Sequence, residues 1–389
     1  MESRRIASLD GLRTIAILAV VAFHYCYRWG PPLNPESLYP YGAALAGLPG
    51  VRLGQYGVHL FFVISGFVIA MTLERCRTPR EFVVRRYARL APAMLLFSAI
   101  TFVAMAAIPH APFPERAAWF ASSLTFIGPV NLNRIAPTIG FQSIDGVYWS
   151  LYVEVQFYAL ACLVYFSARE RFGLWLALLS AIACGLLIVR VPLASPLSNN
   201  LLIPLFLPWF VTGIGFHALA WKADWPLGAL LISVGTLESF ALYLSGVPDA
   251  VPMGVVVGAS ILFAAAIWLR PFAACLASRP MAKIGAASYG LYLLHENVGV
   301  AILHSLPPMQ AVGGAVAVIL LAAGCTAVAL ASFRWIETPL SRALRTWLLP
   351  APVRASTATP GSTRSARPPA GGRRLSARMN PEDRAAGAR

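Results

Sequence analysis

Two residues that are costly in a membrane, Arg13 and His24, lie in the largely apolar stretch from Leu9 to Tyr27, in which Asp10 is expected as a helix-capping residue. Eleven residues separate them, which is about three α-helical turns, so both side chains are expected on one face, ~16 Å apart along the axis. An ionisable group inside a bilayer costs about 2.5–3.5 kcal/mol on insertion scales. We therefore predict that this face lines a polar interior path. The alternative is that Arg13 reaches the headgroups and His24 ends the helix.

A carboxylate is expected near the imidazole. Glu154 lies little more than one turn inside another apolar stretch, which opens with WSLYVEVQFY, at the depth where the first helix ends at His24. A carboxylate close to an imidazole orients it and raises its basicity, as a general base requires. The alternative is a carboxylate that only joins two helices by hydrogen bonds.

Three arginines stand where a third apolar stretch begins near Leu90: Arg85, Arg86 and Arg89. Arg85 and Arg89 are four residues apart, so on a helix they share a face and could hold phosphate oxygens. Basic residues at a membrane border also act as topology signals. Arg13, on the same side of the membrane, favours a site for an anionic ligand.

Three other ionisable residues have several interpretations. His59, near the start of an apolar stretch, faces either the pocket or the membrane interface. His295 and Glu296 lie deep in the apolar stretch 284–304. Because adjacent helical residues point in different directions, each is expected to have its own partner. Packing and lining of a polar pore both remain open for this pair.

The elements that must position these residues are membrane helices. Of the 389 residues, 58% are hydrophobic and 12% are charged, and the mean hydropathy is +0.66. Runs of about 20 apolar residues, bounded by charge or by Gly and Pro, are typical of transmembrane helices. The sequence predicts an all-α polytopic membrane protein with about ten transmembrane helices, at residues 12–27, 57–73, 90–108, 148–168, 174–191, 201–221, 227–244, 251–269, 284–304 and 311–333. Between them, residues 109–147 are expected to form an outer loop with an interfacial or re-entrant helix.

The net charge of +15 is distributed as in a membrane protein. Lys and Arg gather in alternate loops and near the C-terminus, which follows the positive-inside rule and argues against a nucleic-acid partner. Both termini are therefore expected in the cytoplasm, with the protein in the cytoplasmic (inner) membrane. The six cysteines show no metal-ligand spacing, so no metal is expected.

Two domains are expected. Residues 1–350 form the transmembrane domain. Residues 351–389 are rich in Arg, Pro, Ala, Gly and Ser and have almost no apolar content, which indicates a disordered basic cytoplasmic tail in contact with anionic membrane lipid.

Six segments, in this order over residues 6–345, resemble the membrane-bound acyltransferase-3 family: LDGLRTIAILAVVAFHY, GVHLFFVISGF, RRYARLAP, WSLYVEVQFY, SYGLYLLH and FRWIETPLSR. The resemblance implies a ten-helix fold and transfer of an acyl group, typically acetyl from cytoplasmic acetyl-CoA, to a hydroxyl on the outer face. It also implies that Arg13 and His24 are the essential pair, with Glu154 and the region of Arg86 and Arg89 contributing. Family members frequently carry Asp at the position of His59.

The expected function is O-acylation of a surface polysaccharide or lipid-linked sugar by a membrane acyltransferase. Arg85, Arg86 and Arg89 would hold the phosphates of acetyl-CoA, and Arg13 would guide its pantetheine arm. His24 would then take the proton of the acceptor hydroxyl, or take the acyl group itself. Glu154 would orient His24.

Two alternatives remain. The acceptor could instead be a small molecule such as a macrolide or a glycolipid. From a different class, a proton-coupled secondary transporter would use Arg13, His24, Glu154 and His295 as a substrate and proton path. No extracytoplasmic esterase-like domain is seen after the last helix, so the chain is expected to complete the transfer itself or to pass the acyl group to a separate extracytoplasmic protein.

Overall fold

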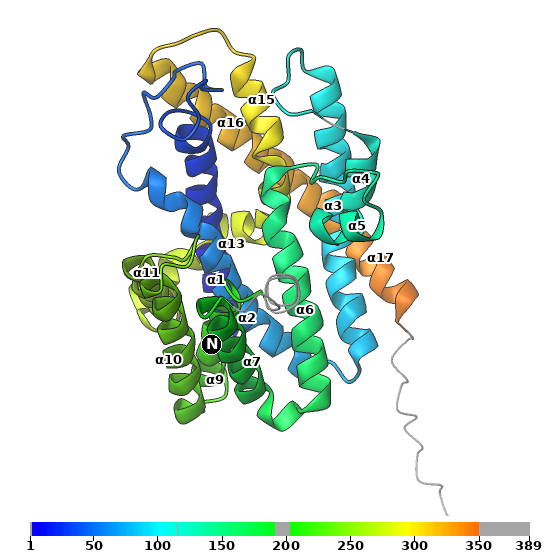
Figure 1. Ribbon diagram of the computed structural model, residues 1–389, viewed down its shortest axis with the longest axis vertical. Coiled ribbons are helices and arrows are strands. Elements are labelled where there is room, and N and C mark those ends of the chain that lie inside the picture. The colour runs from blue at the N-terminus through cyan, green and yellow to red at the C-terminus, as the bar shows by residue number, and fades with distance from the viewer. Residues whose placement is uncertain (1, 115, 191–202, 350–389) are drawn as a thin grey trace, which may run out of the picture. The chain divides into compact units, whose positions relative to one another are not determined.

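The computed structural model describes residues 2–114, 116–190 and 203–349, and within these ranges every regular element is helical, which confirms the all-α prediction (Figure 1). The predicted tail, residues 351–389, lies outside the described residues. The first half of the chain contains α1 (Glu2–Phe23), α2 (Gly57–Arg75), α3 (Pro79–Ala107), α4 (Ala117–Ser123), α5 (Pro129–Ile135), α6 (Trp149–Ser167) and α7 (Phe172–Ile188). The second half contains α9 (Leu207–Trp221), α10 (Trp225–Leu244), α11 (Met253–Trp268), α12 (Arg270–Leu276), α13 (Arg279–Ala286), α14 (Ser288–Leu294), α15 (Asn297–His304), α16 (Ala311–Ser332) and α17 (Thr338–Leu348).

Short turns of other helix types adjoin several of these α-helices. Two are π-helices: η1 (His24–Arg28) continues α1, and η6 (Phe333–Glu337) joins α16 to α17. Three are 3₁₀-helices: η2 (Val51–Tyr56), η3 (Gly146–Tyr148) and η4 (Arg169–Arg171).

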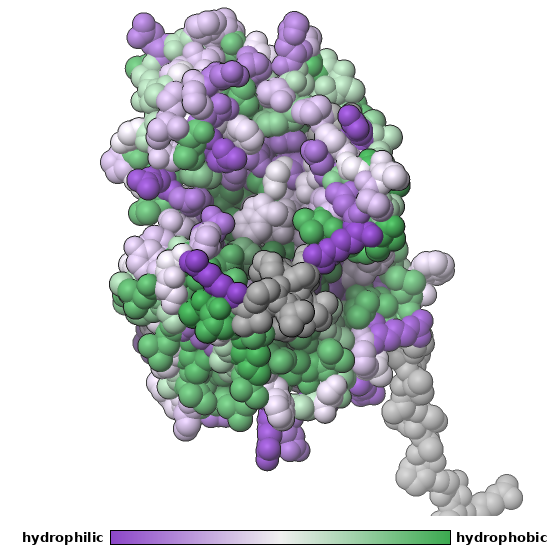
Figure 2. Space-filling model, viewed as in Figure 1, coloured by the Kyte–Doolittle hydropathy of each residue, from purple (hydrophilic) through white to green (hydrophobic). Residues whose placement is uncertain are grey.

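The chain is a multi-pass membrane protein by the length and composition of its helices. In the part of the chain that the structure describes, seven helical segments are long and apolar enough to cross a bilayer, or up to eight if α11 and α12, which meet at a bend of 90°, form one span. Apolar side chains point outward from these segments, for example Leu163 on α6, Ile261 on α11 and Ile319 on α16. Figure 2 shows such side chains covering the lower part of the visible face, whereas polar ones gather above.

Within the described residues this count differs from the expected ten. The predicted helix 284–304 is divided among α13, α14 and α15, and its longest piece has eight residues. In the predicted span 201–221, the described helix α9 has only 15 residues, shorter than the ~20 needed to cross the hydrocarbon core. Hydropathy alone does not separate such internal pieces from spans, because both are apolar.

Small residues let α2 lie close to α9. A Cβ on Gly66 of α2 would stand 2.2 Å from the Phe210 carbonyl oxygen of α9. In return, a Cβ on Gly213 of α9 would stand 2.1 Å from the Val63 carbonyl oxygen of α2. Only glycine allows this approach in both directions, as in other closely packed membrane helices. The packing fixes α2 in the centre of the bundle, where it meets both α1 and α6.

The two ends of the bundle differ in character (Figure 1). At the lower end in this view lie the tight connections from α2 to α3, from α6 to α7 and from α9 to α10, and we call this the basic end because these connections carry Arg75, Arg77, Arg169, Arg171 and Lys222. At the upper end lies the long connection 29–50, and residues 109–114 and 116–147 also lie above the basic end, with the short helices α4 and α5. Neither short helix has enough residues to cross a bilayer.

Candidate active site

His24 stands where α1 changes into the π-helix η1. A π-turn displaces backbone carbonyls from their usual partners, and such turns are frequent at functional sites. Here two tyrosines of the following loop supply donors: the Tyr39 hydroxyl donates to the His24 carbonyl at 2.5 Å, and the Tyr41 hydroxyl donates to the Tyr25 carbonyl. The two tyrosine rings stack at 5.2 Å. The loop therefore holds His24 in place.

The contacts of the His24 ring define which nitrogen is basic. Nδ1 lies 2.9 Å from the Val20 carbonyl oxygen, which only accepts, so Nδ1 carries the proton and Nε2 carries the lone pair. The same Nδ1 lies 3.2 Å from Nε2 of His295, whose own Nδ1 donates to the Tyr292 carbonyl at 2.8 Å. The two imidazoles thus have one consistent set of tautomers, with His24 Nε2 free to accept a proton.

The carboxylate beside His24 is that of Glu296. Its Oε1 lies 3.4 Å from His24 Nε2 and accepts a hydrogen bond from Trp29 Nε1 at 3.1 Å. The prediction that Glu154 would lie against His24 is therefore wrong in its geometry. The prediction of separate partners for His295 and Glu296 is also wrong, because both contact His24. The break between α14 and α15 falls at these two residues, so the angular rule for neighbours on a continuous helix does not apply.

A second carboxyl group, that of Asp145, supports this break. Its Oδ1 accepts from the Val147 amide at 3.1 Å, and its Oδ2 accepts from the Asn297 amide, at the start of α15, at 2.9 Å. Asp145 is completely buried. Burial and the neighbouring Glu296 carboxylate raise the pKa of Asp145 well above its ordinary value. The fold thus favours the protonated form of Asp145, and the Glu296 side chain faces His24.

His24 and Glu296 open onto a hollow of about 610 Å³, which we call the histidine hollow. Its wall also carries Arg28 and several aromatic rings, among them Trp29 and Trp149. The Arg28 guanidinium lies 4.5 Å above the Trp29 ring. His59 lines the same hollow, where its ring packs 4.9 Å from that of Trp209. The hollow thus combines aromatic faces, a cation and a basic imidazole.

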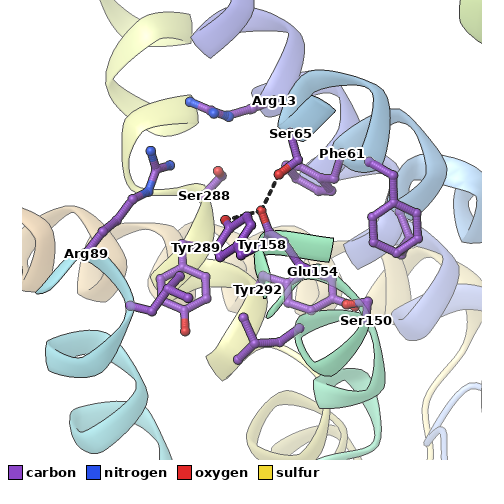
Figure 3. Close-up of a pocket in the computed structure, with 14 residues that line it drawn as sticks. Arg13, Phe61, Ser65, Arg89, Ser150, Glu154, Tyr158, Ser288, Tyr289 and Tyr292 are labelled. Carbon is purple, nitrogen blue, oxygen red and sulfur yellow. Dashed lines mark hydrogen bonds between the residues drawn. The ribbon is translucent and has the colours of Figure 1, made fainter. Parts of the chain in front are cut away.

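A smaller cavity of about 80 Å³ lies further along α1 and is called here the arginine cavity. Figure 3 shows that the guanidinium groups of Arg13 and Arg89 lie on one side of it. Arg13 is paired with Asp10 at 2.7 Å, whereas Arg89 has no ion pair with any described residue. Arg89 is therefore the guanidinium of this cavity that no carboxylate reaches within ion-pair distance among the described residues.

Glu154 belongs to the arginine cavity. Its Oε1 accepts from the Ser65 hydroxyl and from the Tyr158 hydroxyl, each at 2.5 Å, and Figure 3 shows both hydrogen bonds. Neutral donors from α2 and α6 thus fix this carboxylate on the wall of the cavity that carries Arg13 and Arg89. Its expected depth in the membrane predicted a position beside His24. The contacts instead place Glu154 in the arginine cavity, whereas His24 lines the histidine hollow.

The three arginines predicted to act together occupy different surroundings. Arg85 is half-exposed and is paired with Glu81 at 2.7 Å, away from the residues that line the arginine cavity. Arg86 is buried, and its guanidinium donates to the Thr72 hydroxyl and lies 5.7 Å from the ring of Tyr158. Of the three, only Arg89 lines the cavity, so a joint phosphate clamp of Arg85 and Arg89 does not fit the geometry.

The sequence-based interpretation missed Asp145 and the contacts of Glu296. Asp145 precedes the aromatic-rich opening of α6 in a loop with no motif of its own. Glu296 was visible as a costly residue in an apolar stretch, but the segment YLLHENVGV contains no Pro, so nothing in it announced the helix break. The only signal for Glu296 was an ionisable residue within an apolar stretch. That signal suggested a functional role but did not identify the residue that Glu296 contacts.

Comparison with known proteins gives one family and several relatives. The model of a family described as an acyltransferase domain matches residues 6–334. The peptidoglycan O-acetyltransferase of Listeria monocytogenes is 25% identical over 386 aligned residues, which cover 87% of this chain and 56% of the relative. A putative peptidoglycan O-acetyltransferase of Bacillus subtilis is 26% identical over 384 residues, covering 87% and 55%. The O-acetyltransferase of Staphylococcus aureus (strain NCTC 8325) is 26% identical over 381 residues, covering 87% and 58%.

This chain thus spans little more than half the length of the relatives it matches. No solved structure gives a significant match to it.

Proposed function

Because the chain belongs to the acyltransferase-3 family of acyltransferase domains, we propose that it transfers an acetyl group from cytoplasmic acetyl-CoA to a hydroxyl of a carbohydrate or lipid-linked sugar. The relatives carry names that refer to O-acetylation, and two of those names specify peptidoglycan. The single observation that carries the proposal is the His24 ring. Its Nδ1 is occupied by the Val20 carbonyl, and its Nε2 opens onto the histidine hollow beside Glu296.

The proposed reaction is a direct transfer. His24 Nε2 takes the proton of the acceptor hydroxyl as the oxygen attacks the thioester carbonyl, so a C–O bond forms while the C–S bond breaks. The imidazolium then returns the proton to the sulfur of the departing CoA. Glu296 stabilises the imidazolium, because its carboxylate lies 3.4 Å from the nitrogen that becomes N–H. Atoms and protons balance without any other reactant.

The two cavities divide the substrates between them in this proposal. The donor enters at the basic end, which the positive-inside rule assigns to the cytoplasm. Its negative charges are attracted by Arg89 and Arg13, and its pantetheine arm extends past the arginine cavity toward His24. The acceptor sugar occupies the histidine hollow, where the aromatic rings of Trp29 and Trp149 offer apolar faces and Arg28 attracts an anionic group.

A labelled-donor experiment tests the proposal. The purified full chain in lipid nanodiscs is incubated with acetyl-CoA labelled in the acetyl group, with chitopentaose as a soluble acceptor. We expect release of CoA that depends on chitopentaose, with label on the sugar. No CoA release in nanodiscs, together with movement of acetyl-CoA or sugar into sealed vesicles that contain the same protein, would contradict the proposal and favour a transporter.

A further inference from the structure

The arginine cavity and the histidine hollow share part of their walls. Among the described residues that line them, Val58 and Tyr292 belong to both sets. Val58 lies near the start of α2, and Tyr292 lies in α14. Both side chains are almost fully buried, at 6% and 7% exposure. These two residues therefore form the partition between the space beside Arg89 and the space beside His24.

Contacts on both sides hold the ring of Tyr292 in this position. The ring centre lies 6.2 Å from that of Phe61, which lines the arginine cavity, and 5.6 Å from that of His295, the partner of His24. The Tyr292 hydroxyl donates to the Val147 carbonyl at 3.0 Å and lies 2.8 Å from the Ser150 hydroxyl. Figure 3 shows Tyr292 and Ser150 together at the edge of the arginine cavity. The ring is fixed at both its edge and its hydroxyl.

For the proposed function, the partition formed by Val58 and Tyr292 would restrict the width of the donor rather than its length. If the acetyl group of the proposed function reaches His24 from the arginine cavity, it passes between Val58 and Tyr292. A straight acyl chain is no wider than the thioester arm that follows it, and beyond the partition the histidine hollow offers about 610 Å³ for its tail. A branch at the carbon next to the carbonyl widens the group at the point that must pass.

We propose that Val58 and Tyr292 are specificity-determining residues that admit straight acyl groups and exclude branched ones. This inference rests on the proposed function, because it concerns the path of the donor toward His24. It adds the class of donor: thioesters of CoA with unbranched acyl groups.

The test compares two donors with the same number of carbon atoms, butyryl-CoA and isobutyryl-CoA. The full chain in nanodiscs is assayed for thiol release with chitopentaose as the acceptor, and the ratio of kcat/KM for the two donors is measured. We expect the wild-type protein to prefer butyryl-CoA. Tyr292→Ala and Val58→Ala should each shift this ratio toward isobutyryl-CoA by about tenfold, since a factor of ten corresponds to a change of about 1.4 kcal/mol in relative activation energy.

Matched substitutions outside both cavities provide the controls. Tyr165→Ala on α6 and Val256→Ala on α11 remove side chains that are equally buried, at 4% and 3% exposure, and that do not line either cavity. They should leave the donor ratio of the wild-type protein unchanged. Val58→Ala keeps the inference testable if Tyr292→Ala does not fold, because it widens the same passage from the other helix.

The outcomes separate the inference from the proposed function. Equal use of both donors by the wild-type protein, or an unchanged ratio in folded Tyr292→Ala and Val58→Ala variants, would overturn the inference while leaving acyl transfer intact. Absence of thiol release from acetyl-CoA itself in the folded wild-type protein would overturn both.

Discussion

The two cavities contain similar residue types but connect them differently. In the arginine cavity, the Glu154 carboxylate is occupied by two neutral hydroxyl donors, and Arg13 is paired with Asp10. In the histidine hollow, His24 and Glu296 contact each other directly, and His295 and Asp145 lie behind them. In the first cavity Glu154 and Arg13 are held by separate partners, whereas in the second the titratable side chains of His24, Glu296 and His295 contact one another.

This difference indicates a division of labour. A guanidinium such as that of Arg89, which has no ion-pair partner in the described part of the chain, attracts an anionic ligand without changing its protonation state, which suits binding. An imidazole suits proton transfer when one ring nitrogen is already hydrogen-bonded and the other is basic and lies beside a carboxylate. Substitutions in the histidine hollow should therefore change the rate of the chemical step, and those in the arginine cavity should change the affinity for the donor. The predictions that follow test this contrast.

The largest effect is expected for His24→Ala. Loss of the general base should lower kcat by about 10²–10⁴-fold, with a small change in the KM for acetyl-CoA. The measurement is acceptor-dependent CoA release by equal amounts of folded protein. His217→Ala removes a histidine that is also buried but lines neither cavity, and it serves as the control. A His24→Ala variant with full activity would remove His24 from the reaction.

Glu296→Gln should have the next largest effect. The amide retains the shape of the side chain but does not stabilise an imidazolium as a carboxylate does. A hydrogen bond to a charged group is worth about 1.5–3 kcal/mol, so kcat should fall about 10- to 100-fold. Glu154→Gln is the comparison. This substitution lies in the arginine cavity, so it should change mainly the KM for acetyl-CoA and leave kcat nearly unchanged. If Glu154→Gln lowered kcat more than Glu296→Gln did, the assignment of the two carboxylates would be reversed.

A smaller effect, confined to the donor, is expected for Arg89→Ala. Because Arg89 lines the arginine cavity without an ion-pair partner among the described residues, its removal should raise the KM for acetyl-CoA about tenfold and leave kcat nearly unchanged. Arg85→Ala, one helical turn away and paired with Glu81, should change this KM by less than about twofold. Equal effects of the two substitutions would show that the contrast between them is wrong.

The smallest effect concerns stability and pH. The folded protein binds the Asp145 proton more tightly than the unfolded chain does, since the pKa of Asp145 is raised in the fold. Stability from this group is therefore lost as the pH rises above the ordinary aspartate value of 3.8 toward the raised pKa. Because the side chain introduced by Asp145→Asn cannot ionise, the Tm of the wild-type protein relative to this variant should decrease as the pH is raised above the ordinary aspartate value of 3.8. A Tm difference that stays constant or increases would contradict the protonated state of Asp145.

The sequence predicted well what depends on local composition. Long apolar runs identified α2, α3, α6, α7, α10 and α16, because a bilayer span must be apolar along its whole length. The helix 1 motif placed Arg13 and His24 on an element that lines both cavities. The sequence did not predict features that depend on tertiary contacts. The helix break at His295 and Glu296 is one of these, because it is supported by Asp145, about 150 positions earlier in the chain.

The same limit explains the misplaced partner of His24. Glu154 and Glu296 are both carboxylates in apolar stretches, and depth along a helix does not state which way a side chain turns. The π-turn at His24 and the helix break at Glu296 bring that pair together, and neither irregularity has a residue signature in this chain. Arg85 and Arg89 differ for a similar reason, because Glu81 is one turn before Arg85 and pairs with it at the surface.

The central claim is that a donor entering at the basic end acylates an acceptor held in the histidine hollow. A vesicle assay with donor and acceptor on opposite sides of the membrane tests this claim most directly. The full chain is reconstituted into sealed liposomes that enclose chitopentaose, and acetyl-CoA labelled in the acetyl group is added only outside. Molecules with the basic end outward should acetylate the enclosed sugar, and His24→Ala vesicles should not. Labelling of the sugar only when it shares a compartment with acetyl-CoA would contradict the account.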